Sequence, residues 1–224
     1  YIESMDKGAD TIVLTGSCGP CRFGYYGVVE KEILNNHGYT MDVVILDAPG
    51  LGYKAFIQRI LKISGNSSWT KIARAFLKAS KIVSQVDELL DISLKKRPRE
   101  LHKGETNKVL ARFEKEVLDC HGSREISALI EKYKEIFLEI KEKENTVPLK
   151  IGLIGEIYTL IEPYVNLNIE KKLGDLGVEV YRGITVSDWV KTHLSLDMKY
   201  KKRRKEILEK GKDYLGLCIG GHAW

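Results

Sequence analysis

The feature that most constrains the fold is a short apolar run ending in a glycine-rich turn, followed by a helical pattern and a second apolar run. The apolar runs are 11-TIVLT-15 and 41-MDVVILDA-48, and residues 23–36 between them carry apolar side chains at helical spacing. A strand, a helix and a strand in this order predict a βαβ unit with parallel strands. The turn after the first strand then lies at the carboxyl edge of a sheet, where open α/β proteins bind ligands.

The middle of the chain has a pattern typical of long amphipathic helices. Apolar residues recur three and four positions apart over residues 52–64, 68–95, 105–119 and 123–143. We expect these apolar stripes to face a core and the charged residues to face solvent. The two clearest stripes are Ile72, Phe76, Leu77, Ile82 and Val83, and Ile126, Leu129, Ile130, Tyr133, Ile136, Phe137 and Ile140.

The α/β pattern returns after this helical region. Residues 149–155 predict a buried strand, residues 156–163 a loop or short turn, residues 168–176 a helix, and residues 178–182 another strand. A second parallel unit therefore begins near residue 148.

These patterns predict an α/β protein with Rossmann- or flavodoxin-like parallel-sheet lobes and a large helical insertion. The first lobe, residues 1–147, contains the strands near 11–15 and 41–48 and the helical region 52–145. The second lobe, residues 148–224, is expected to be incomplete at its C-terminus.

Composition narrows the function classes. The chain has 224 residues and a formal net charge of +5, a small excess that does not demand a nucleic-acid partner. No apolar run approaches the about 20 residues of a membrane-spanning helix, and the first residues are polar and acidic, unlike a signal peptide. We therefore expect a cytoplasmic protein without a membrane segment. Because its first residue is not Met, we also expect it to be part of a longer polypeptide.

The turn after the first strand contains two thiols in the order Cys-Gly-Pro-Cys, at Cys18 and Cys21. One interpretation is a redox dithiol, in which the start of the following helix lowers the pKa of a nucleophilic Cys18 and Cys21 resolves the disulfide. A second is two ligands of a zinc or iron–sulfur site. A third is a pair of thiols without a function.

The sequence gives evidence against a simple form of the dithiol and metal interpretations. The dithiol interpretation lacks the tryptophan expected before the first cysteine, because Gly16 and Ser17 stand there. The metal interpretation needs further ligands, and the remaining cysteines, Cys120 and Cys218, are far away in sequence. That spacing excludes a compact four-cysteine zinc ribbon but allows a site with scattered ligands.

Several segments together resemble a known family, the acyl-CoA dehydratase activase-related proteins and their relatives, the 2-hydroxyacyl-CoA dehydratase subunits and double-cubane-cluster reductases. The resemblance spans nearly the whole chain. It is carried by 15-TGSCGPCRFGYY-26, 43-VVILDAP-49, 151-IGLIGEIYTLIEPYVNLNIEKKLGDLGVEVYR-182 and 220-GGH-222.

The resemblance implies an iron–sulfur cluster, of the [4Fe-4S] or double-cubane type, ligated by Cys18 and Cys21 and reduced by an ATP-dependent activator protein. Family members transfer electrons under anaerobic conditions. If this chain is an enzyme, it is expected to be a dehydratase-like lyase acting on a 2-hydroxyacyl-CoA or an ATP-dependent reductase component. A homo- or hetero-oligomer is also expected, because apolar faces left uncovered by a missing segment favour association with another copy or with the rest of a longer chain. A non-catalytic lobe of a larger protein of this kind is the further alternative.

Four more residues are expected near the cofactor. Gly19 leaves backbone N–H groups accessible to cluster sulfides, and Arg22 adds positive charge that favours thiolates. Glu156 follows the first strand of the second lobe, at its expected carboxyl edge, and His222 could orient a ligand or donate a proton. For Arg22 a surface position is the alternative, for Glu156 helix capping and packing, and for His222 a structural role.

Overall fold

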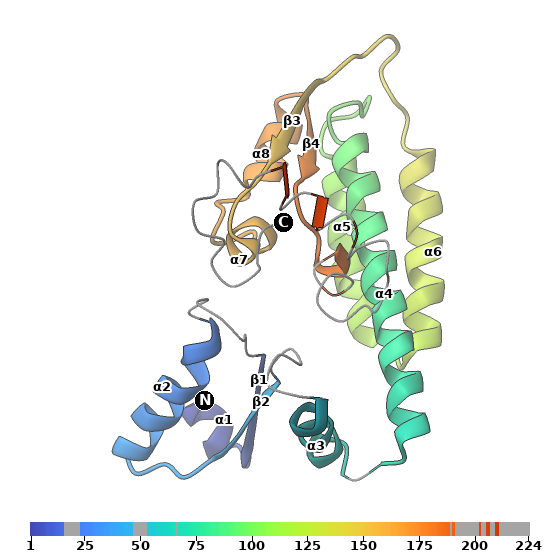
Figure 1. Ribbon diagram of the computed structural model, residues 1–224. Helices are drawn as coiled ribbons and strands as arrows, with labels where there is room; N and C mark the ends of the chain where they lie inside the picture. The colour runs from blue at the N-terminus through green and yellow to red at the C-terminus, as the bar shows by residue number, and fades with distance from the viewer. Residues whose placement is uncertain are drawn as a thin grey trace. The chain divides into compact units, whose positions relative to one another are not determined.

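The computed structural model describes residues 1–15, 23–46, 53–65, 67–188, 190, 202, 205–206 and 209–210. This part of the chain is a mixed α/β structure that is mostly helical and contains two small parallel sheets of two strands each (Figure 1). Two compact units form, one containing Tyr1–Ile72 and the other Ala73–Lys191. The domain boundary expected near residue 148 stays a prediction. No helix of the described residues has the length and apolar character needed to cross a membrane.

The first unit contains the predicted βαβ arrangement. Its elements are α1 (Ile2–Asp6), β1 (Thr11–Thr15), α2 (Phe23–Asn36), β2 (Asp42–Leu46) and α3 (Tyr53–Ile63). The strands β1 and β2 pair in parallel, with Thr11 opposite Asp42 and Thr15 opposite Leu46. The parallel pairing predicted from the two apolar runs is therefore confirmed, whereas the short helix α1 was not predicted.

Close packing of α2 on this sheet explains a glycine in the helix. A Cβ atom at Gly27 would lie 2.7 Å from Cδ1 of Ile45 on β2 and 3.3 Å from Cδ1 of Leu14 on β1. The helix can approach both strands because this position has no side chain. Beside this contact, Ile12, Leu34 and Met41 form a small buried cluster.

The second unit is built around long helices, α4 (Trp69–Lys96), α5 (Glu105–Glu116) and α6 (Ser123–Glu139), with a short 3-10 turn, η2 (Val117–Asp119), after α5. Figure 1 shows α4, α5 and α6 as the green to yellow helices. The ring of Phe113 meets that of Tyr133 edge to face, with 5.4 Å between centroids. The apolar stripe predicted for α6 is confirmed as core. The buried cluster consists of Leu89, Val109, Phe113, Ile130, Tyr133, Phe137 and Ile140.

The stripe predicted from Ile72 to Val83 in α4 is a core element only in part, because Ile82 packs against the buried cluster whereas Phe76 and Leu77 are exposed. Phe76 is 46% exposed and Leu77 is 69% exposed, so the expectation that they are buried was wrong. The buried residues of α4 are Gln85, Leu89, Ser93 and Leu94, all in its second half. Helical spacing indicates an apolar face but not how far along the helix that face is covered.

The segments that follow α4 and α6 are tied to each other. Leu101 N donates to Lys141 O at 2.7 Å, and Lys143 N donates to Arg99 O at 2.8 Å. The buried carboxylate of Glu100 lies in the first of these segments and accepts hydrogen bonds from Gly104 N and from Thr106 N, the latter at 2.7 Å. It therefore satisfies backbone donors at the start of α5, which Gly104 cannot do because it has no side chain.

The second sheet follows these helices in the chain. Its strands β3 (Leu149–Leu153) and β4 (Val178–Arg182) pair in parallel, with Leu149 opposite Val178 and Leu153 opposite Arg182. Between them lie α7 (Ile157–Ile161) and α8 (Ile169–Asp175). The strands and α8 were predicted, whereas the loop or short turn expected over 156–163 contains the five-residue helix α7, which Glu156 caps. The expectation that β3 is a buried strand was wrong, because Leu149 is 68% exposed.

Replacing Gly174 with alanine is expected to lower the free energy of unfolding by about 1–2 kcal/mol. A Cβ atom there would lie 2.5 Å from Cδ and 3.0 Å from Cγ of the buried Arg97 side chain, whose Nε donates to Asn107 Oδ1 at 3.0 Å. The matched control is Gly152→Ala on β3, where no atom lies within 4 Å of the added methyl. Urea unfolding followed by circular dichroism measures both, and equal effects would contradict the packing of α8 on Arg97.

Candidate functional site

The carboxyl ends of β1 and β2 define the first candidate site. Both strands end at the same edge of the parallel sheet, at Thr15 and Leu46. Arg59 of α3 donates from Nη1 to the carbonyl oxygen of Ile45 at 2.8 Å, so α3 is attached close to this edge. Residues 16–22 follow β1 in the chain and precede α2, and residues 47–52 follow β2. The chain therefore leaves the edge through the segment that contains both thiols.

Most residues of the predicted site belong to segments outside the described part of the chain. Cys18, Gly19, Cys21 and Arg22 lie in residues 16–22, and His222 lies beyond the last described residue. Their roles as ligands or cofactor contacts stay predictions.

Glu156 is the predicted site residue that the structure describes. It stands at the N-cap of α7, three residues after the end of β3, and its Oε2 accepts hydrogen bonds from Thr159 N at 3.0 Å and from Thr159 Oγ1 at 3.2 Å. The capping role offered as the alternative for this residue is confirmed. A role toward a cofactor stays a prediction.

The turn after α7 uses its polar side chains to hold its own backbone. Asn166 Nδ2 donates to Leu160 O at 3.1 Å, and Asn166 Oδ1 accepts from Ile169 N at 3.3 Å. Glu162 Oε1 accepts from Tyr164 N at 3.2 Å. Leu167 adopts a left-handed backbone conformation, with φ of 58°. The polar side chains of this turn therefore have a local structural use.

A charged network attaches β4 to the helices of its own unit. Glu179 is only 2% exposed, and its carboxylate accepts hydrogen bonds from the guanidinium of Arg99 and from the hydroxyl of Tyr181. Burial acts to raise the pKa of Glu179, but the hydrogen bonds from Tyr181 and Arg99 outweigh it and lower that pKa. The carboxylate is therefore held in its charged form inside the structure.

A second ion pair lies at the carboxyl end of β4. Arg182 donates from Nε and Nη2 to the two carboxylate oxygens of Glu170, at 2.5 and 2.6 Å. The hydrogen bond from Arg182 to Glu170 raises the arginine pKa, although burial opposes it. This bidentate pair fixes α8 on the end of β4.

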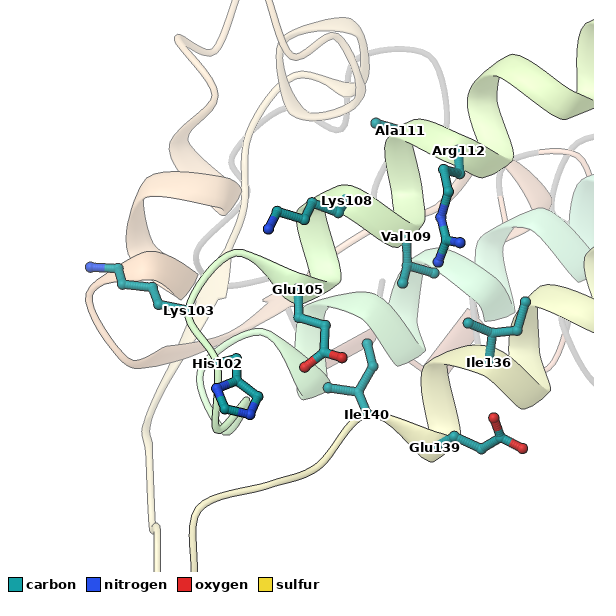
Figure 2. A pocket seen from close by; sticks show the side chains of 10 residues that line it. All are labelled: His102, Lys103, Glu105, Lys108, Val109, Ala111, Arg112, Ile136, Glu139 and Ile140. Carbon is teal, nitrogen blue, oxygen red and sulfur yellow. The ribbon is translucent and has the colours of Figure 1, made fainter.

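Sequence reasoning missed a pocket of about 800 Å³ in the second unit, beside α5 and the C-terminal end of α6 (Figure 2). Val109, Ile136 and Ile140 line its apolar part, and charged groups include Glu105 and Arg112. A signal was present in the sequence, because positions 105, 108, 109 and 112 share one helix face and combine charged with apolar residues.

The described residues offer no cluster of three or more His, Cys, Asp or Glu side chains that could hold a metal ion. Cys120 is a free thiol among them, and its Sγ lies 3.8 Å from Glu116 O, a weak contact within its own turn. The thiolate donors that suit an iron–sulfur group are those of Cys18 and Cys21, and their fit depends on the segment outside the described residues.

Comparisons with known proteins give no match: no family model, no curated protein and no solved structure corresponds to this chain.

Proposed function

We propose that the chain is an iron–sulfur electron-transfer or reductase component similar to the 2-hydroxyacyl-CoA dehydratase-type proteins. The observation that carries the proposal is the connection of β1 to α2, because the thiol-containing segment 16–22 leaves the carboxyl edge of a parallel sheet and enters a helix. We also propose that each two-stranded sheet belongs to a Rossmann- or flavodoxin-like lobe. The residues and the topology support both proposals, and the comparisons with known proteins add no support.

The chain's own residues would act in defined ways. Cys18 and Cys21 would bind the cluster as thiolates, and the start of α2 favours negative charge in front of it. Gly19 leaves room for the backbone to approach, and Arg22 would balance the charge of the reduced site. When bound, the cluster supplies one electron at a time at low potential.

The partners follow from this chemistry. A low-potential cluster needs an electron donor, and we propose an ATP-dependent activator protein, with a 2-hydroxyacyl-CoA or another small molecule as the acceptor. The remaining cluster ligands would come from scattered residues or from a second copy or another subunit. The proposal includes a cytoplasmic location and anaerobic metabolism.

Anaerobic reconstitution with iron and sulfide tests the proposal. We expect stoichiometric iron and sulfide with a cluster spectrum in the unaltered protein, and loss of both in Cys18→Ser and Cys21→Ser, because each substitution removes a thiolate ligand. The matched control is Cys120→Ser, which removes a thiol with only a local contact and should keep the cluster. Cluster retained in the variants at Cys18 and Cys21 would contradict the proposal.

The same segment supports a second candidate, a thiol–disulfide oxidoreductase with Cys18 as the nucleophile and Cys21 as the resolving thiol. A helix start lowers the pKa of a nearby thiol, which both functions need. No cluster, together with a Cys18–Cys21 disulfide that cycles at a thioredoxin-type potential, would favour this candidate. No cluster and inert thiols would favour a non-catalytic lobe.

A further inference from the structure

The pocket beside α5 has an apolar wall and a charged rim. Val109 and Ile140 are buried core residues whose side chains also line the pocket, and Ile136 is half-buried next to them. Figure 2 shows Val109 between Glu105 and Arg112 along α5, with Ile136 and Ile140 on the facing segment. The pocket can therefore cover the apolar part of a small molecule while charged groups contact its ends.

The charges of the pocket are separated along the helix. Glu105 and Arg112 are seven residues apart, two helical turns or about 10 Å of rise. Lys108 and Val109 lie between them on the same face. Glu105 and Arg112 thus lie at the two ends of this face with Val109 between them, and the carboxylate of Glu139 on α6 also lines the pocket. Unlike charges at the two ends complement a molecule with two unlike polar ends and an aliphatic middle.

The carboxylate end has an unmet hydrogen-bonding requirement. Glu105 Oε2 is buried, and it has no hydrogen-bond partner in the described part of the chain. A buried carboxylate oxygen without a donor costs free energy, and a ligand hydroxyl or ammonium group would recover that free energy when the Glu105 side chain turns this oxygen toward the pocket. This oxygen distinguishes the pocket from an ordinary basic surface, since a simple anion would not satisfy it.

The cationic end is available as well. Within the described residues, Arg112 and Lys108 form no hydrogen bond or ion pair through their side chains, although the charge of Arg112 helps to lower the pKa of Glu116. On α6, by contrast, Lys132 is paired with Glu116 at 3.2 Å and Lys134 with two glutamates. An arginine fork without a carboxylate partner suits a ligand carboxylate or phosphate.

The geometry points to a binding site for an elongated amphoteric small molecule. Its anionic group would contact Arg112, its hydroxyl or ammonium donor would contact Glu105, and its aliphatic middle would cover Val109 and Ile140. This inference does not rest on the proposed function, because it concerns different residues in a different part of the chain.

Titration with ε-aminocaproate, observed through the backbone amide signals of the full chain, tests the inference. We expect saturable shifts centred on α5 and the end of α6. Caproate lacks the ammonium donor and hexylamine lacks the carboxylate, so each should bind at least about tenfold more weakly than ε-aminocaproate. Arg112→Gln and Glu105→Gln should each weaken binding of ε-aminocaproate by a similar factor, because each removes one charged contact.

The matched control is Lys115→Gln, which removes an exposed cation of α5 that does not line the pocket and should leave the affinity unchanged. Circular dichroism of each variant establishes that the helices are intact. The inference is overturned by the absence of saturable shifts, by caproate binding as tightly as ε-aminocaproate, or by unchanged affinity in both pocket variants.

Discussion

Truncating Phe137 to alanine is expected to lower the free energy of unfolding by about 3–5 kcal/mol. The side chain is 0% exposed and belongs to the cluster shared by α4, α5 and α6. Its removal deletes the buried ring and leaves a cavity that Leu89 and Tyr133 can fill only in part, because they are themselves fully packed. Urea unfolding followed by far-ultraviolet circular dichroism measures the loss.

The neighbouring residue provides the control. Leu138 is the next residue of α6 and is 61% exposed, so Leu138→Ala should change the free energy of unfolding by no more than about 0.5 kcal/mol. Because both substitutions shorten an apolar side chain of the same helix, helix propensity cannot account for a difference. Similar losses for the two variants would mean that α6 does not bury the face described here.

Replacing Arg99 with methionine is expected to lower the free energy of unfolding by about 3 kcal/mol near neutral pH. The substitution keeps much of the apolar stem but removes the cation. Of the two side chains that donate to the buried Glu179 carboxylate, Arg99 and Tyr181, only Tyr181 then remains. The same unfolding measurement applies, repeated over a range of pH.

A double substitution and the pH dependence separate this cause from simple loss of packing. Adding Glu179→Met should recover most of the loss, because an apolar pair removes the uncompensated charge. In the unaltered protein the folded-state pKa of Glu179 is lowered, so its stabilisation is present above the ordinary glutamate pKa and is lost as pH falls through the folded-state value. The cost of Arg99→Met should therefore shrink in acid, and a cost independent of pH would contradict the ion-pair explanation.

Local sequence patterns predicted most of the regular elements. The apolar runs over β1 and β4, and the helical spacing of α2, predicted the observed elements, because each segment carries a clear apolar pattern. Glycines with positive φ, Gly38 and Gly177, follow α2 and α8. Which part of an apolar helix face is buried was harder to predict. Phe76 and Leu77 have the spacing of a buried stripe, but burial depends on which partner a helix face meets, and spacing does not encode that partner.

The sheet edge that precedes the thiol segment was predicted, whereas the site itself stays a prediction. Parallel pairing of β1 and β2 follows from the order of the elements, and it fixes the edge from which the segment of Cys18 and Cys21 departs. The capping role of Glu156 was named only as an alternative. The pocket at Arg112 was missed because it depends on how α5 lies against α6, a long-range relation that neither helix shows by itself.

The carboxylate of Glu100 has a consequence for binding as well as for folding. By accepting from the backbone at Gly104 and Thr106, it orders the segment that carries His102 and Lys103, two residues of the pocket rim. The backbone bond between Leu101 and Lys141 restrains the same segment from the other side. Most of the conformational entropy of this rim is therefore lost during folding, and a ligand that enters the pocket meets a preorganised wall.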